Sequence, residues 1–300
     1  MTFSASDAAF EGFRIVRRRP LAVLAWALAY IVAFALGFAL VGKTALMLVQ
    51  QVEALQGVTQ PTMAELAPLF RGYGVVLGVA GPLSILIGTM LSTAVARSVV
   101  EPKASAFGYL RLGKDELRVF GAMVVLYVLA MAYYMVAVAV CVAIGVFAHL
   151  SGQWWLWLFC VAAAIAAILT LIWLAVRLSL MVPIIVAEKR FALFDSFKLT
   201  KGQFWPLLGM ALLALVMAIV VSFLGTIVSL PLRLPLTAPF SQIQDPSEVM
   251  PLILQHIGLI IPFIVINTVL AVLQMAVMYA PFAAAYRAIK GEPVAPVAAG

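Results

Sequence analysis

Residues 161–176 read VAAAIAAILTLIWLAV and contain no charged side chain. A membrane-spanning β-strand would alternate apolar and polar residues over about ten positions, so this run argues against a transmembrane β-barrel. It predicts an α-helix that crosses a bilayer, because a hydrocarbon core of about 30 Å needs about 20 apolar helical residues. The whole chain has this character, since 65% of its residues are hydrophobic and only 10% are charged. We therefore expect an integral membrane protein.

Six apolar segments are long enough to span a membrane, and we predict one transmembrane helix in each. The expected fold is all-α, a single polytopic membrane domain over residues 1–300 that ends in a short cytoplasmic tail at 291–300. Two long outer connections remain. The first, 43–72, begins with helical spacing and is predicted to hold an outer-surface helix, whereas 233–251 is rich in proline and polar residues and is predicted to be a loop. The six predicted helices are residues 21–42, 73–99, 119–148, 155–186, 207–232 and 252–286.

The net charge of +7 is explained by where the cations lie and does not require nucleic acid as a partner. Lys and Arg gather before the first predicted helix, between the second and third, between the fourth and fifth, and after the sixth. The other connections hold only Lys43, Arg71 and Arg233. By the positive-inside rule, we expect a multi-pass protein of the bacterial inner (plasma) membrane with both termini in the cytoplasm. Cations at that surface also attract anionic lipid headgroups by about 1 kcal/mol each.

Three short stretches of the chain align without a gap: FEGFRIVRRRPL from Phe10, FGYLRLGKDELR from Phe107 and FDSFKLTKGQFW from Phe194. Each begins with an aromatic residue and has a large apolar residue three positions later, which a cation follows directly. The pattern predicts three pseudo-repeats, each an amphipathic surface helix followed by a transmembrane hairpin. Ordinary charged loops of a polytopic protein are the alternative. The predicted units are residues 1–100, 101–187 and 188–290.

The short helix of each unit is predicted to lie in the headgroup plane of the membrane. At 100° per residue, Phe194, Phe197 and Phe204 fall on one arc, while Asp195 and Lys198 lie outside it. We therefore expect the aromatic residues to face the bilayer and the cations to meet anionic headgroups. The cations expected to make these headgroup contacts are Arg14, Arg17, Arg18, Arg111, Lys114, Lys198 and Lys201.

The segment WLAVRLSLMVPIIVAEKRFALFDSFKLTKGQFWPLLGMALL, residues 173–213, combines an Arg at a helix end, a Pro, an acidic residue and a polar string ending in Gly and an aromatic residue. It resembles poorly characterised bacterial six-helix membrane proteins of the glycerophosphodiester phosphodiesterase membrane-domain type. The resemblance implies six helices and is silent on activity; that family is named for a domain beside a phosphodiesterase, and we expect no such catalytic domain here. The matching positions are Arg177, Pro183, Glu188, Ser196, Lys198, Leu199, Thr200, Lys201, Gly202 and Phe204.

Three polar residues fall within the predicted helices: Arg177, Asn267 and Gln274. We expect Arg177 to reach the headgroups or to contact Glu188, because an unpaired Arg deeper in the membrane would cost roughly 3 kcal/mol to insert. Asn267 and Gln274 are seven residues apart and share a helix face, which suits an interhelical hydrogen bond. The alternative is that all three residues line a substrate path.

Motifs of catalysis are not found in the sequence. Neither His149 nor His256 has a carboxylate or a second metal ligand nearby, so we expect no catalytic residue, no metal site and no cofactor. The function expected is a non-catalytic scaffold or accessory factor that engages anionic membrane lipids or other envelope proteins. A small-molecule or lipid transporter, with Arg177, Asn267 and Gln274 along its path, is the alternative. An intramembrane enzyme would need a polar cluster that the sequence does not contain.

Overall fold

The computed structural model describes residues 4–55, 62–103, 106–111, 113–241 and 248–291, and within them the chain is helical and forms no strand. Six helices are long and apolar enough to cross a membrane, which confirms the predicted all-α polytopic fold. The long helices are α3 (Pro20–Ala54), α4 (Met63–Val100), α5 (Lys114–Ser151), α6 (Leu156–Leu178), α9 (Phe204–Ser241) and α11 (Ile257–Lys290). The short elements are α1 (Ala5–Ala9), α2 (Glu11–Arg18), the 3₁₀ turn η1 (Ala106–Tyr109), α7 (Met181–Glu188), α8 (Asp195–Leu199) and α10 (Val249–Gln255).

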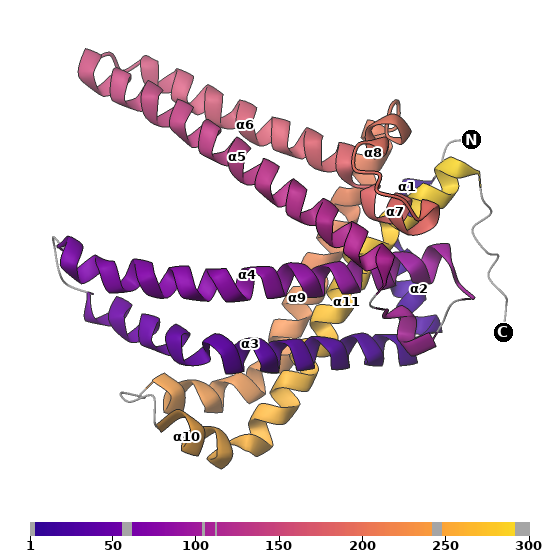
Figure 1. The fold of residues 1–300 in the computed structure, drawn as a ribbon, viewed down its shortest axis with the longest axis horizontal. Helices are drawn as coiled ribbons and strands as arrows, with labels where there is room; N and C mark the ends of the chain where they lie inside the picture. Colours follow the sequence, from indigo (N-terminus) through magenta and orange to yellow (C-terminus); the bar gives the residue numbers. More distant parts are fainter. Residues whose placement is uncertain (1–3, 56–61, 104–105, 112, 242–247, 292–300) are drawn as a thin grey trace.

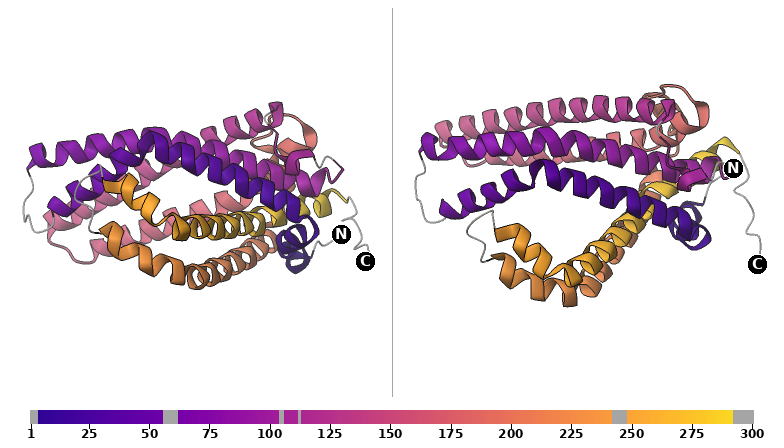
Figure 2. Two further views of the ribbon diagram at one scale, coloured as in Figure 1. Left: turned by 90° about the horizontal axis from the view of Figure 1, so that it is seen from below. Right: turned by 60° about the horizontal axis from the view of Figure 1, so that its bottom comes forward.

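The long helices form three hairpins, which meet at one end of the molecule and spread apart toward the other (Figures 1 and 2). α3 packs on α4, α5 on α6, and α9 on α11. Where the hairpins meet, α11 also contacts α3 and α4, and α7 contacts α4. We call this region the basic end, because every Lys and Arg except Lys43, Arg71 and Arg233 belongs to it. It comprises residues 4–20, 97–103, 106–111, 113–118, 177–204 and 286–291.

Several spans are longer than the sequence predicted, and α4 already begins at Met63, within the 43–72 connection. α3 continues through the first part of the 43–72 connection to Ala54, so this part is helical as predicted, but it extends the span and is not a separate outer-surface helix. α9 runs through three prolines to Ser241, and α10 follows, so the loop predicted over 233–251 is wrong for the residues that the structure describes. Proline is tolerated in membrane helices where neighbouring groups satisfy the freed backbone. Beyond Gly291, the predicted tail 291–300 lies outside the described residues.

The three aligned stretches adopt different structures. The first forms α2 and the third forms α8, but in the second Phe107 and Tyr109 have φ values of 49° and 66°, and only a 3₁₀ turn forms. The amphipathic helix predicted for the second unit is therefore wrong. α3 and α9 begin at aligned positions, Pro20 and Phe204, whereas α5 begins earlier in the alignment, at Lys114. The internal repeat stays a prediction.

α2 docks on α11 through a close approach of the two backbones. Gly12 lies on the buried face of α2, and a Cβ there would be 2.5 Å from Val277 Cα and 2.7 Å from the carbonyl oxygen of Ala276. Glycine lets the two helices come this close because it has no Cβ. The other face of α2 leaves Phe10 and Phe13 exposed, as an apolar arc facing a bilayer would be.

Gly12→Ala should weaken the docking of α2 on α11, because overpacking a tight contact costs about 1–3 kcal/mol. The measurement is the melting temperature of the purified protein. Gly74→Ala in α4 is the matched control, since an added Cβ there meets nothing within 4 Å, and alanine is the better helix former by about 1 kcal/mol. Equal melting temperatures for the two variants would contradict the close approach.

Candidate functional site

The packed interior of the molecule lies at the basic end. Its buried side chains come mainly from the last turns of α4, from α7 and from the last turns of α11, with Leu91, Ile184 and Ala283 as examples. These three segments contact one another, although they belong to different hairpins. Toward the opposite end, apolar side chains such as Met63 and Leu150 are exposed, as residues facing lipid would be. The hairpins are therefore joined at the basic end.

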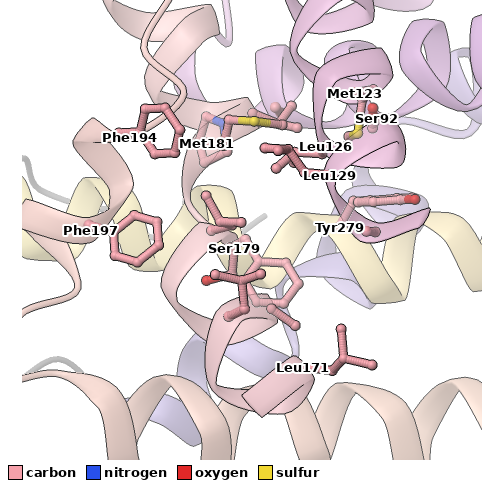
Figure 3. Close-up of a pocket in the computed structure, with 18 residues that line it drawn as sticks. Ser92, Met123, Leu126, Leu129, Leu171, Ser179, Met181, Phe194, Phe197 and Tyr279 are labelled. Atoms are coloured by element: carbon pink, nitrogen blue, oxygen red, sulfur yellow. The ribbon is translucent and has the colours of Figure 1, made fainter. Parts of the chain in front are cut away.

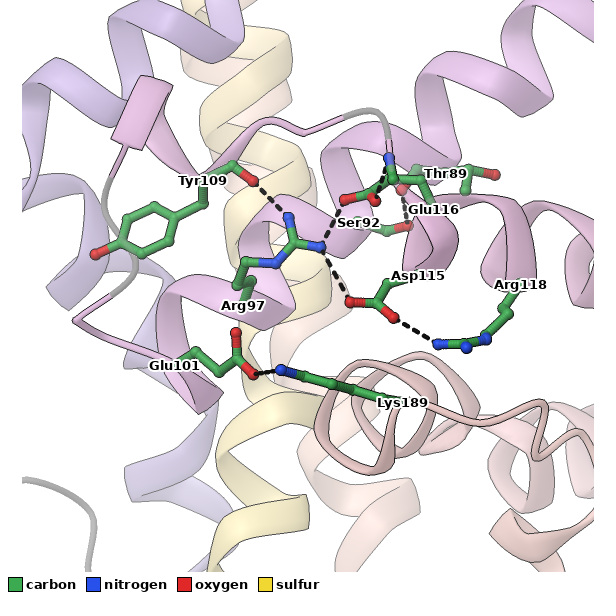
Figure 4. A network of polar contacts seen from close by, with 10 residues as sticks. Thr89, Ser92, Arg97, Glu101, Tyr109, Asp115, Glu116, Arg118 and Lys189 are labelled. Carbon is green, nitrogen blue, oxygen red and sulfur yellow. Dashed lines mark hydrogen bonds and ion pairs between the residues drawn. The ribbon is translucent and has the colours of Figure 1, made fainter.

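Arg97 is the central polar group of this interior, with only 2% of its surface exposed (Figure 4). Its Nη2 donates to the Glu116 carboxylate at 2.6 Å, and its Nη1 donates to the carbonyl oxygen of Tyr109 at 2.7 Å. Glu116 also accepts a hydrogen bond from the backbone N–H of Gly113 at 3.0 Å. Arg97 belongs to α4 and Glu116 to α5, so the buried ion pair connects the first hairpin to the second.

The η1 turn that supplies an acceptor to Arg97 is itself held against α3. The indole N–H of Trp26 donates to the carbonyl oxygen of Gly108 at 2.6 Å. Gly108 has a φ of +63°, and a Cβ there would be 2.9 Å from Ala25 Cβ, so both its conformation and its surroundings require glycine. The guanidinium of Arg19 lies 4.9 Å from the ring centroid of Tyr109, within the range of a cation–π contact.

Further ion pairs surround the buried pair. Asp115 accepts from Arg118 at 2.8 Å and lies 3.9 Å from Arg97. Lys189 pairs with Glu101 at 3.3 Å, which joins the residue after α7 to the residue after α4 (Figure 4). These ion pairs are partly exposed to solvent, so each contributes little to the stability of the fold by itself. Together they leave the acidic residues of this region paired with cations of the same chain.

Glu188, at the end of α7, accepts hydrogen bonds from two cations. Arg190 lies 2.6 Å and Lys290 of α11 lies 3.1 Å from its carboxylate. Burial raises the pKa of Glu188, but the hydrogen bonds from Lys290 and Arg190 outweigh it and hold the pKa below its usual value. Hydrogen bonds from Arg190 and Lys198 likewise lower the pKa of Asp195. Both carboxylates are therefore ionised at neutral pH and balance part of the local positive charge.

The cations predicted to contact headgroups are, with one exception, exposed at the basic end. Arg14 differs, because it is half-buried and forms ion pairs with Asp7 and, at 3.3 Å, with Glu11. The pair with Asp7 raises the pKa of Arg14 and lowers that of Asp7, mainly through their hydrogen bond. The exposed members of the set are Arg17, Arg18, Arg111, Lys114, Lys198 and Lys201.

The three polar residues predicted within the membrane make separate contacts. Arg177 turns toward α8, where Nη1 donates to the carbonyl oxygen of Phe197 at 3.3 Å and to Thr200 Oγ1 at 3.4 Å. The alternative contact with Glu188 is not among its interactions. Asn267 donates to a carbonyl oxygen of its own helix at 2.7 Å, and so does not make the interhelical bond that the sequence suggested. Gln274 is half-buried elsewhere on α11.

A cavity of about 410 Å³ lies beside α8, between the second and third hairpins and the end of α4 (Figure 3). Its lining is almost wholly apolar, and Arg177, Asn267 and Gln274 are not part of it. The lining side chains include Leu129, Leu171, Ala175, Phe194, Phe197 and Tyr279.

The arrangement can bind and orient charged groups. Within the part of the chain that the structure describes, no group of three His, Cys, Asp or Glu residues is placed to hold a metal ion. Sequence reasoning missed the pairing of Arg97 with Glu116, and neither residue was among those it singled out. The sequence did hold one signal for the position of Glu116. It lies three residues after Gly113, and an acidic residue at this spacing can accept a hydrogen bond from the backbone N–H at the start of a helix.

Neither a family model, nor a curated protein, nor a solved structure matches this chain. The resemblance of residues 173–213 to the phosphodiesterase membrane-domain family therefore stays a prediction. The function must be argued from the geometry of the basic end and of the cavity beside it.

Arg97→Met should lower the free energy of unfolding by about 3–5 kcal/mol, because Glu116 would stay buried without its partner. The double variant Arg97→Met/Glu116→Met should recover most of that loss, since two apolar side chains can fill the site. Melting temperatures in detergent measure both effects. The exposed Arg71 of α4 provides the control, Arg71→Met, which should change little. If Arg97→Met is no more harmful than this control, the buried pair does not join the hairpins.

Proposed function

We propose that this protein is a non-catalytic factor of the bacterial inner membrane, with both termini in the cytoplasm, that engages anionic lipids through its basic end. Its partners are lipid headgroups and, through the same surface, other envelope proteins. Nucleic acid has no part in this proposal. The observation that carries it is the joint exposure of cations and large aromatic side chains on one end of the molecule.

The segment around α8 presents this combination most clearly. Phe194 is 62% exposed and Trp205 is 76% exposed, although both lie beside the packed interior. The side chain of Lys198 is 85% exposed, and Lys201 is exposed as well. Aromatic rings favour the level of the lipid headgroups, and cations next to them meet the phosphates. The exposure of Phe194 and Trp205 is costly in water and favourable at a membrane surface.

The pairing of the acidic groups supports a binding role in preference to a catalytic one. Glu116, Glu188 and Asp195 each accept from cations of the same chain, and their geometry holds helices together. General acid–base chemistry needs a group that is poised to exchange a proton with a substrate. Glu188 and Asp195 are instead held in their ionised forms by the hydrogen bonds described above.

A transporter is the second candidate, favoured by the cavity beside α8. The three polar residues that would mark its path do not line that cavity, which weakens a route for a polar solute. An apolar cavity fits a lipid better, and a lipid is also what the basic end would attract.

The proposed function predicts that anionic lipid is enriched around the protein. In proteoliposomes, spin-labelled phosphatidylglycerol should associate several-fold more strongly than spin-labelled phosphatidylcholine, given about 1 kcal/mol for each cation near the surface. The preference should weaken as salt shortens the Debye length from about 10 Å to about 3 Å. Neutralising Arg17, Arg18, Lys198 and Lys201 to Gln should remove most of it.

The matched control keeps the charge at the same four positions, as Arg17→Lys, Arg18→Lys, Lys198→Arg and Lys201→Arg, and should keep the preference. Equal association of the two lipids, or a preference that the Gln variant retains, would refute lipid engagement by these cations. Metal-dependent hydrolysis of glycerophosphodiesters that survives stringent purification would refute the non-catalytic assignment.

A further inference from the structure

We infer that the cavity beside α8 holds an acyl chain of one anionic phospholipid, whose phosphate is bound by Arg177. This inference rests on the proposed function and makes it specific, since it replaces a general attraction to lipid with one bound molecule. It follows from the lining of the cavity, from the side on which it opens, and from the unused donors of Arg177.

The lining selects an apolar ligand. The hydroxyl groups of Ser92 and Ser179 both line the cavity, but each donates to a carbonyl oxygen of its own helix, at 3.1 Å and 2.8 Å. The remaining lining is aliphatic and aromatic, apart from the hydroxyl group of Tyr279 (Figure 3). A polar solute would lose its hydration here without gaining partners. The volume of about 410 Å³ falls in the range of ligand-binding cavities.

The cavity opens sideways between membrane-spanning helices. Three residues that line the cavity are also exposed on the outside of the helices: Leu129 and Ala130 of α5 and Ala175 of α6. Side chains at these positions of a transmembrane helix face the hydrocarbon of the bilayer. A ligand can therefore enter from the bilayer without crossing water, which favours an acyl chain of a membrane lipid over a soluble molecule.

Arg177 does not line the cavity but is bonded to the lining residue Phe197, and it retains donors for an anion. It lies on α6 between the lining residues Ala175 and Leu178, and its guanidinium is 5.6 Å from the ring centroid of Trp173. Its two hydrogen bonds use Nη1 only and are long. Nε is buried without a partner among the described residues, so the donors left for a phosphate are those of Nη2 together with Nη1. A guanidinium binds phosphate through two parallel N–H donors, a role that a single carbonyl and a hydroxyl do not fill.

Phe197 lies between the proposed acyl-chain site, which is the cavity, and the proposed headgroup site at Arg177. Its ring lines the cavity, while its carbonyl oxygen accepts from Arg177. One lipid can therefore place an acyl chain against the ring and its phosphate near the guanidinium. Lys198 follows directly and is exposed, which adds positive charge on the same side. The nearby carboxylate of Asp195 is compensated by Arg190 and Lys198.

Two substitutions that fill the cavity test whether it holds an acyl chain. The full-length protein is purified in detergent from a bacterial host, washed, and analysed by native mass spectrometry and by lipid extraction. The native chain should retain one anionic phospholipid. Ala175→Phe, and independently Ala130→Phe, should cut the retained lipid to less than about a tenth, because the ring occupies the space. Both residues are exposed, so a phenylalanine there need not disturb the packed interior, and a native melting temperature verifies this.

Ala166→Phe is the matched control on the same helix. Ala166 is exposed and lies nine residues from Ala175, which places it half a turn away at 100° per residue, and it does not line the cavity. This variant should retain the lipid. Arg177→Gln should still bind a lipid but lose roughly tenfold of the selectivity for anionic over zwitterionic headgroups.

Several results would overturn the inference. They are retention of the lipid by both filling variants, a bound lipid that is mainly zwitterionic, a free fatty acid in its place, or a dimer that Ala175→Phe dissociates. Failure of the inference and failure of the proposed function are distinguishable, because Ala175→Phe leaves every surface cation in place. If the cavity holds no lipid but the salt-sensitive preference for phosphatidylglycerol persists, only the inference fails.

Discussion

The structure depends on how one buried charge is compensated. Arg97 lies in an interior that is otherwise apolar, and an unpaired guanidinium there would cost several kcal/mol. Glu116 and the carbonyl oxygen of Tyr109 satisfy it, and these partners lie on two other elements. The end of α4, the η1 turn and the start of α5 are thereby fixed relative to one another. Trp26 then ties the same turn to α3, so a single polar cluster sets the geometry of the first two hairpins.

The spreading of the hairpins follows from where specific contacts are available. Lipid tails are as apolar as the helix surfaces, so two apolar helices gain little by associating within a bilayer. Helices stay together where backbones approach closely, as at Gly12 against Val277, or where polar groups pair. Both kinds of contact gather at the basic end. Toward the opposite end the hairpins diverge, and the space left between the second and third hairpins near the basic end is the cavity beside α8.

The sequence was sufficient to predict the spans, because their length and hydropathy are properties of single segments. It also predicted headgroup contacts for seven cations; all but Arg14 are exposed, and the contacts themselves stay a prediction. It did not predict the partner of Arg97, because Glu116 is contributed by the next helix and the pairing is a tertiary contact. The η1 turn was missed for a related reason: its left-handed backbone is stabilised by contacts with α3, which the pattern of its own residues does not encode. The sequence singled out Arg177 but suggested Glu188 as its contact, because the actual partners, Phe197 and Thr200, are tertiary contacts that spacing does not encode.

The proposed engagement of anionic lipid requires that the packed, positively charged end of the molecule faces the cytoplasm. A topology reporter tests that claim most directly. Reporters fused after Gly300 and inserted near Arg190 should both be cytoplasmic, and reporters inserted near Gln60 and Gln242 should both be exported, because the cations flank the former pair of sites. An exported reporter at Gly300, or a cytoplasmic one at Gln60, would contradict the orientation and with it the engagement of cytoplasmic anionic lipid.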